Sequence, residues 1–141
     1  MITSARNQFS GEVAQARHGA VNDEVILRLD GGQEIVATVT SESASRLGLA
    51  AGKKATAMVK ATSVIVMVDV DVSKVSARNA VSGKVSDIRK GAVNTDVTIT
   101  DDTGLAISAI ITNSSADRLG LAVGKPAAAV FKASSVIVAV G

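Results

Sequence analysis

The chain contains two copies of one sequence, and this repeat constrains its fold more than any other feature. When the sequence is shifted by 72 positions against itself, residues 4–69 (copy 1) align without a gap with residues 76–141 (copy 2). Of these 66 aligned pairs, 36 are identical. Two copies at this period indicate two domains rather than a solenoid. We predict the domains at residues 1–70 and 73–141.

Each predicted domain has only about 70 residues, a size at which a single core is marginally stable. Docking between the copies or between chains would remove further apolar surface from water. We therefore expect self-association on structural grounds alone.

Within copy 1, the apolar pattern predicts five strands and one short helix. Alternation at Val25, Leu27 and Leu29 is typical of a half-buried strand. The helix is expected over residues 40–47, with Thr40 or Ser41 as N-cap and Gly48 after its end. The other strands are expected at residues 10–16, 35–39, 55–60 and 63–68, the last two around a tight bend.

This order of elements predicts a mainly β fold of tandem OB-like, five-stranded Greek-key barrels, each with one short helix. The helix falls between the third and fourth strands, as that architecture requires. Residues 69–75 join the copies without glycine or proline, which indicates a stiff, partly extended connector.

Composition excludes several classes of function. The chain has no cysteine, so disulfides and thiol chemistry are absent. Phe9 and Phe131 are its only aromatic residues and its net charge is only +2, a poor match to single-stranded nucleic-acid binders. No apolar run approaches a membrane span and no secretory signal is seen, so a cytoplasmic location is expected.

No catalytic or metal-ligating constellation is found, and we predict that the chain is not an enzyme. His18, the only histidine, is replaced by Lys90 in copy 2 and is interpreted as a solvated loop residue. The carboxylates are scattered and are interpreted as solvated surface; they are Asp23, Glu24, Glu34 and Glu42.

Hydrogen-bond donors, in contrast, recur at the same places in both copies. They are Ser4, Arg6, Asn7, Thr40, Ser43, Lys60 and Ser63 in copy 1, and Ser76, Arg78, Asn79, Thr112, Ser115, Lys132 and Ser135 in copy 2. Each has a purely structural alternative. The threonines could be helix caps, the last serines turn residues, and the cations solvated edge-strand charges.

Together, these donors describe a pocket for a tetrahedral oxyanion. A dianion only accepts hydrogen bonds, and the amides of a helix that begins near Thr40 would add donors. Four or five hydrogen bonds to a charged group, at roughly 1.5–3 kcal/mol each, could give about micromolar affinity. A partly protonated phosphate would also need an acceptor, so the set favours a molybdate- or sulfate-like ion.

The order of these motifs resembles the Mop, or molbindin, family. The motifs are Ser-Ala-Arg-Asn, Gly-Ala-Val-Asn, Thr-x-x-Ser-Ala-x-Arg-Leu-Gly-Leu, Gly-Lys and Lys-Ala-x-Ser-Val-Ile, present in both copies. The resemblance implies cytoplasmic OB-like domains that bind molybdate, and often tungstate, between domains. Two-domain members form homotrimers. The same domain pair occurs in a molybdate-responsive transcription regulator and in the ATPase subunit of molybdate importers.

The resemblance also implies the site residues. One class of oxyanion site falls on Ser4, Arg6, Thr40, Ser43 and Lys60 and on Ser76, Arg78, Thr112, Ser115 and Lys132. A second class falls on Gly19, Ala20, Val21 and Asn22 (bend 1) and on Gly91, Ala92, Val93 and Asn94 (bend 2). Molybdenum would be bound only as the oxyanion, with no direct protein ligand and no further cofactor. Many members have Pro-Trp after Lys-Ala, whereas this chain has Thr62-Ser63 and Ser134-Ser135.

Storage of molybdate is therefore the predicted function, because no DNA-binding or nucleotide-binding region accompanies the two copies. Two alternatives stay open: a molybdate sensor that docks on a partner protein, and an OB-like nucleic-acid-binding module. Neither nucleic acid nor a membrane is an expected partner. Which copy contributes which residues to a shared site is left open by the sequence.

Overall fold

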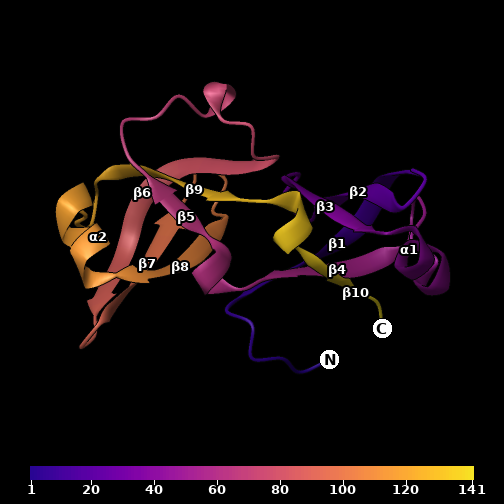
Figure 1. The fold of residues 1–141 in the computed structure, drawn as a ribbon, viewed down its shortest axis with the longest axis horizontal. Helices are drawn as coiled ribbons and strands as arrows, with labels where there is room; N and C mark the ends of the chain where they lie inside the picture. The colour runs from indigo at the N-terminus through magenta and orange to yellow at the C-terminus, as the bar shows by residue number, and fades with distance from the viewer. The chain divides into compact units, whose positions relative to one another are not determined.

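A computed structural model describes all residues 1–141, and both copies form the same elements (Figure 1). Copy 1 forms β1 Asn7–Arg17, β2 Asn22–Leu29, β3 Glu34–Thr40, α1 Ser41–Leu47, β4 Lys54–Val59 and β5 Ile65–Met67. Copy 2 forms β6 Asn79–Lys90, β7 Asn94–Thr100, β8 Ala106–Thr112, α2 Asn113–Leu119, β9 Pro126–Phe131 and β10 Ile137–Ala139. Short 3-10 turns lie at Ala61–Ser63, Val72–Lys74 and Ala133–Ser135.

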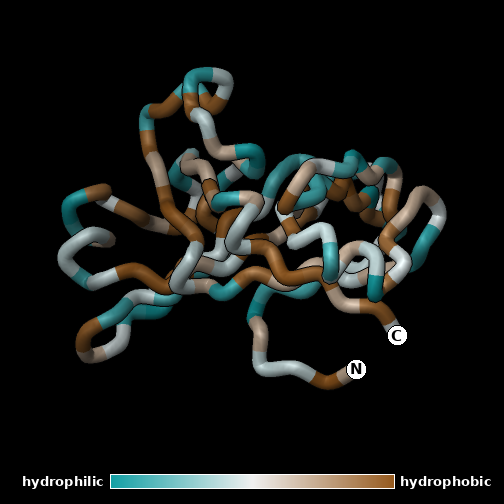
Figure 2. Tube along the Cα trace, turned by 45° about the vertical axis from the view of Figure 1, so that its right-hand side comes forward, coloured by the Kyte–Doolittle hydropathy of each residue, from teal (hydrophilic) through white to brown (hydrophobic).

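The core of each unit follows from the alternation seen in the sequence. Val25, Leu27 and Leu29 of β2 are buried, while the residues between them are partly or fully exposed. In copy 2, Val97 and Ile99 are fully buried in the same way. In Figure 2, hydrophobic and hydrophilic stretches alternate along the chain. Valine, alanine, leucine and isoleucine thus form most of both cores.

The first strand of each copy is longer than predicted and contains a β-bulge, between Val13 and Gln15 in β1 and between Val85 and Asp87 in β6. The N-terminal half of β1 pairs with β4 and its C-terminal half pairs with β2. Gly11 lies where the two halves meet and faces Leu29 on one side and Ala55 on the other. A Cβ at Gly11 would lie 2.1 Å from the carbonyl oxygen of Arg28. Glycine is required there because the two backbones approach too closely for any side chain.

The predicted short helix is confirmed. α1 begins after Thr40, whose extended backbone and side-chain oxygen cap it, and it ends at Gly48 in the left-handed conformation, with φ 66°. α2 repeats this arrangement with Thr112 and Gly120. Both copies therefore begin their helix at a threonine of the repeated Thr-x-x-Ser motif.

The last strand of each copy lies in the sheet formed by the other copy. β5 pairs with β9 in the order β5-β9-β6-β7-β8, and β10 pairs with β4 in the order β10-β4-β1-β2-β3. Figure 1 shows β5 in magenta beside β9, and β10 in yellow beside β4. The expected neighbours β4 and β5 do not pair, because the turn Ala61–Ser63 carries the chain into the other sheet.

The exchange defines two compact units that cross the repeat boundary. Unit 1 contains residues 1–60 and 132–141, and unit 2 contains residues 61–131. The sequence copies, predicted as domains 1–70 and 73–141, are therefore not the units that pack in space. Each unit has five strands and one helix, and β10 also approaches β3 to close part of a barrel. The predicted fold class of tandem OB-like barrels is confirmed.

The connector between the copies is less extended than predicted. It contains the 3-10 turn Val72–Lys74, capped by Asp71, whose carboxylate accepts hydrogen bonds from the amide and the hydroxyl of Ser73. Just before it, Asp69 has φ 53°, a left-handed conformation that is uncommon outside glycine. No helix of the chain has the length and apolar character needed to cross a membrane.

Candidate functional site

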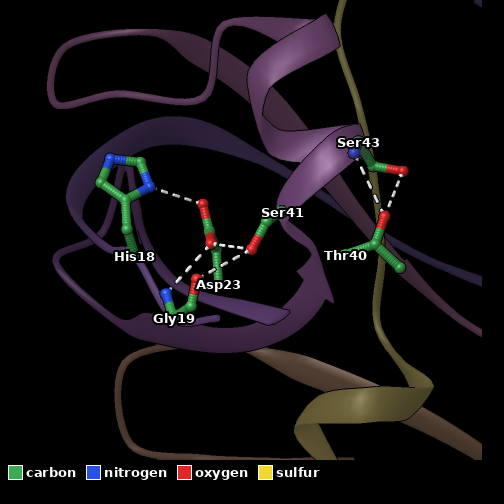
Figure 3. A network of polar contacts seen from close by, with 6 residues as sticks. All are labelled: His18, Gly19, Asp23, Thr40, Ser41 and Ser43. Carbon is green, nitrogen blue, oxygen red and sulfur yellow. Dashed lines mark hydrogen bonds and ion pairs between the residues drawn. The ribbon is translucent and has the colours of Figure 1, made fainter. Parts of the chain in front are cut away.

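The hydroxyl of Thr40 caps α1 and also orients the hydroxyl of Ser43 (Figure 3). The Ser43 amide donates to Thr40 Oγ1 over 3.1 Å, and Thr40 Oγ1 donates to Ser43 Oγ over 2.8 Å. A hydroxyl has only one proton to donate. Thr40 uses its proton inside this pair, whereas the proton of Ser43 is left to point toward a ligand.

The same pair recurs in copy 2, where the two distances between Thr112 and Ser115 are 3.1 and 2.9 Å. The capping alternative for both threonines is therefore correct. It also satisfies an amide that we expected to be free at the helix start. Within this motif, the serines rather than the threonines are the donors available to an oxyanion.

A cavity of about 390 Å³ in unit 2 lies beside this motif. Its polar lining comes from Thr112 and Ser115 at the start of α2, Asn94 at the start of β7, Arg118 on α2, and Thr62. Thr62 belongs to copy 1 and reaches unit 2 because the exchanged segment carries it there. One cavity therefore joins the Lys-Ala-x-Ser segment of copy 1 to the Thr-x-x-Ser segment of copy 2.

Arg118 is the one charged side chain in this lining, and sequence reasoning missed it. It is exposed and lies in the last turn of α2. The signal was present, because Arg-Leu-Gly-Leu-Ala recurs in both copies at Arg46 and Arg118. We interpreted that stretch only as the end of a helix. A guanidinium beside two donor side chains suits an oxyanion.

The other predicted site residues do not line this cavity. Ser76 and Arg78 belong to unit 2 but lie in the segment before β6, and both are exposed. Lys60 and Lys132 directly follow β4 and β9, and both are grouped with unit 1. Unit 1 therefore contains both lysines together with Ser4, Arg6, Thr40 and Ser43.

Four repeated donors of the predicted set occupy structural positions. Asn7 and Asn79 are 2% and 3% exposed, and the Asn7 side chain donates to the carbonyl oxygen of Val59 over 3.3 Å. Ser63 and Ser135 lie in the 3-10 turns, as their structural alternative predicted.

The interpretation of Asp23 as solvated surface is wrong. The residue is 1% exposed, and its carboxylate anchors bend 1 to α1 (Figure 3). Asp23 Oδ1 accepts the Ser41 hydroxyl at 2.6 Å and the Gly19 amide at 3.3 Å, and Oδ2 lies 2.7 Å from His18 Nδ1. The exposed His18 is thus a loop residue, as predicted, but it is paired.

These contacts explain the electrostatics of Asp23. The hydrogen bonds from Ser41 and then from His18 outweigh the effect of burial and hold the pKa of the Asp23 carboxyl below its ordinary value of 3.8. Asp23 is therefore an anion at neutral pH, and its negative charge is stabilised by the surrounding donors.

Copy 2 builds the same corner from neutral side chains. Thr95 replaces Asp23 and donates to Asn113 Oδ1 over 2.6 Å, while Asn113 Nδ2 donates to the carbonyl oxygen of Gly91 over 2.9 Å. The Gly91 amide bonds to the carbonyl oxygen of Asn94 at 2.8 Å instead of to a side chain. The two bends have identical sequences but different supports.

Comparison with known proteins identifies the family. A family model described as the TOBE domain matches residues 3–66 and again residues 75–138. The chain belongs to the TOBE domain family. The two TOBE matches coincide with the two sequence copies rather than with the two exchanged units.

Relatives with curated names carry the same domain pair. The Molybdenum transport protein ModE is 44% identical in Herbaspirillum seropedicae and 46% identical in Azotobacter vinelandii, each over 140 residues. The Molybdenum-pterin-binding protein MopA of Rhodobacter capsulatus is 42% identical over 139 residues. Each match covers 99% of this TOBE chain and 52% of the relative, so the chain spans about half the length of these proteins.

A solved structure matches the TOBE pair over its full length. The cytoplasmic molybdate-binding protein ModG, crystallised with molybdate bound, is 46% identical, with a TM-score of 0.92 and 100% of both chains covered. The resemblance to the Mop family deduced from the motifs is thereby confirmed.

Proposed function

We propose that this TOBE protein binds molybdate as a dianion and serves to store it in the cytoplasm. The cavity of unit 2 supports this most directly, because it places Arg118 with the donors Ser115, Thr62 and Asn94 and contains no carboxylate. Such a lining can satisfy an ion that only accepts hydrogen bonds. A ModG structure of 46% identity holds molybdate on the same fold.

Molybdate and tungstate have the same shape and charge, and we propose that the protein accepts both. Sulfate has the same charge in a smaller shell of oxygens, so the fixed spacing of donors would discriminate against it. The proposed activity is binding of the anion, without a chemical reaction.

The first-class site would draw on Ser4, Arg6, Thr40, Ser43 and Lys60 and on Ser76, Arg78, Thr112, Ser115 and Lys132. Each copy repeats the hydroxyl pair of Thr40 and Ser43, so equivalent sites are expected twice per chain. We add Arg46 and Arg118 to this set. The bends Gly19–Asn22 and Gly91–Asn94 form the proposed second class.

Self-association, as a homotrimer, is part of the proposal. Apolar side chains are exposed at equivalent places in both copies: Val21 is 73% and Val93 71% exposed, and Ile65 is 54% and Ile137 58% exposed. Repetition of the same exposed residues suits an assembly with repeated interfaces, which would remove them from water.

Equilibrium dialysis against molybdate, tungstate, sulfate and phosphate tests the function. We expect retention of molybdate and tungstate at micromolar concentrations and little retention of phosphate. A protein that retains no molybdate at tens of micromolar would refute the proposal. Native mass measurement with and without molybdate tests the trimer and counts the bound ions.

Molybdate sensing is the second candidate, because a relative of 38% identity is named the Transcriptional regulator ModE of Yersinia pestis. A sensor would bind a partner protein in one ligand state only. Pull-down from a cell extract with and without molybdate separates the two: storage predicts no partner that depends on the anion.

A further inference from the structure

A row of charged side chains crosses the outer face of the sheet in unit 1. In cross-strand register over β4, β1, β2 and β3, the row consists of Lys54, Glu12, Arg28 and Glu34. All four are exposed, and the residue that follows each of them in the chain is buried. The side chains of this charge row therefore face away from the core, and their charges alternate in sign from strand to strand.

Unit 2 builds the same sheet without this row. The residues in the same register are Pro126, Lys84, Thr100 and Ala106, which carry a single charge. The strand order is nevertheless equivalent in the two sheets. The fold therefore does not require the charge row, and stabilisation of the sheet does not by itself explain it.

The outer face of unit 1 is also more apolar beside the row. Two residues before Arg28 on β2 lies Ile26, which is half-exposed and pairs with Val36 of β3. Their counterparts in unit 2 are Thr98 and Ser108, which also pair. An apolar patch bordered by charged side chains is typical of a protein interface, and only the sheet of unit 1 has one.

The charge row is complementary to a second copy of itself. Consider two such sheets packed face to face, with a two-fold axis between them that runs parallel to the strands and midway between β1 and β2. Lys54 then faces Glu34 of the partner subunit, and Glu12 faces Arg28 of the partner subunit. Opposite charges meet at every position of the row. A cavity of about 580 Å³ lined by Lys54, Glu12 and Arg28 leaves room for the long side chains of the partner.

We propose that unit 1 pairs face to face with unit 1 of a second chain through the charge row and Ile26. Such a contact is isologous and closes after two copies. It goes beyond the proposed function and does not depend on a bound anion. It also differs from the interfaces proposed for the trimer, because Val21 and Val93 recur in both copies whereas the charge row occurs once per chain. Because its charges are exposed, the pair should be weak and sensitive to salt.

Sedimentation velocity of the wild type tests the pairing. At about 0.01 M salt the screening length is about 30 Å, and at about 1 M it is about 3 Å. We expect a larger sedimenting species at low salt, which returns to the smaller species at high salt.

Two charge reversals test the arrangement of the row. In E12R and in R28E, two contacts between opposite charges become contacts between like charges, so the association of each variant with itself should weaken about tenfold or more. An equimolar mixture of E12R and R28E restores opposite charges at every position and should associate as the wild type does. The double variant E12R/R28E is complementary to itself again and should also associate.

The matched control is K84E, because Lys84 is the exposed counterpart of Glu12 in unit 2. It should associate as the wild type does. Hydrogen exchange of β1–β4 in each variant checks that the sheet is intact.

A wild type that sediments identically at both salt concentrations would overturn the inference. So would self-association of E12R and R28E at the wild-type level, or a mixture of the two that fails to associate. Molybdate retention should be unchanged in every variant, since none of these residues belongs to the proposed anion sites. A wild type that retains no molybdate would refute the proposed function and leave this pairing in place.

Discussion

The proton of one serine hydroxyl decides how the Thr-x-x-Ser motif can work. Because Thr40 accepts from the Ser43 amide and donates to Ser43 Oγ, the motif presents a single outward donor per copy. Chains of hydrogen bonds polarise one another, so this donor is a better one than an isolated hydroxyl. Under the proposed function, the threonine would act on the oxyanion only through the serine.

Substitutions in copy 2 should therefore separate binding from stability. Ser115→Ala removes the outward donor, and we expect about a tenfold to hundredfold loss of molybdate affinity with little change in stability. Thr112→Ala removes the helix cap as well and should lower the free energy of unfolding by about 1 kcal/mol. Dialysis and urea unfolding measure the two quantities. Equal stability losses in both variants would contradict this division.

Arg118 should matter to the same cavity through its charge. Arg118→Ala is expected to weaken molybdate binding by about tenfold, and Arg118→Lys should retain part of that affinity, since a point charge replaces a bidentate donor. Arg89→Ala is the matched control, because Arg89 is also an exposed cation of unit 2 but pairs with Asp87 away from the cavity. Similar losses from R118A and R89A would indicate a general charge effect instead.

At the scale of elements, Asp23 joins the β1–β2 loop to the first residue of α1. Ser41 also donates its amide to the carbonyl oxygen of Val21 at 2.9 Å, so the bend and the helix are fixed together. In copy 2 the same junction is made by Asn113, whose backbone amide donates to the carbonyl oxygen of Val93. The junction in copy 1 contains the ionisable side chain of Asp23, whereas Thr95 and Asn113 at the junction in copy 2 are neutral.

This difference predicts an acid-sensitive junction at bend 1 that bend 2 lacks. The pKa of Asp23 is lowered in the folded protein, so its stabilising contribution is complete above the ordinary carboxyl value of 3.8 and is lost as the pH falls below it. Urea unfolding from pH 6 to pH 3 should show a smaller loss of stability for Asp23→Asn than for the wild type. Parallel curves would mean that the contacts of Asp23 contribute nothing to folding.

At the scale of the whole molecule, the exchange of β5 and β10 makes each unit depend on both copies. Val66 of β5 is 7% exposed and lies in unit 2, while its counterpart Val138 of β10 is 8% exposed and lies in unit 1. In this structure, neither copy completes its five-stranded sheet from its own residues. The exchange also carries Thr62 to the cavity beside Thr112 and Ser115.

Val66 and Val138 form a matched pair that tests the exchange. Each valine-to-alanine change should cost about 1–3 kcal/mol through lost burial and a small cavity. Hydrogen exchange should locate the effect in the opposite copy: V66A should weaken protection of β9 and β6, and V138A that of β4 and β1. Loss of protection within the substituted copy's own strands would show that the strands are not exchanged.

The sequence by itself determined the local structure of this protein. Alternation of valine and leucine predicts β2, and threonine followed by glycine eight positions later predicts the limits of α1, because these signals act over a few residues. The repeated donors and their order identified the family, and through it the kind of ligand that we propose. The length of β1 was underestimated, since the predicted strand 10–16 omits residues 7–9, which pair with β4 and not with β2.

Only the tertiary structure decided which copy completes which sheet and where Asp23 lies. Because Ser-Val-Ile-Val recurs at the last strand of both copies, the apolar pattern of β5 fits either sheet, and no local pattern distinguishes exchange from its absence. Asp23 reads as a surface carboxylate because its shortest hydrogen bond, from Ser41, joins residues that are far apart in the sequence. Ser41 is 18 residues away and meets it only when β2 and β3 pair. Contacts of this kind depend on the pairing register of strands that are far apart in the sequence. That register brings Ser41 to Asp23 and Thr62 to the cavity beside Thr112.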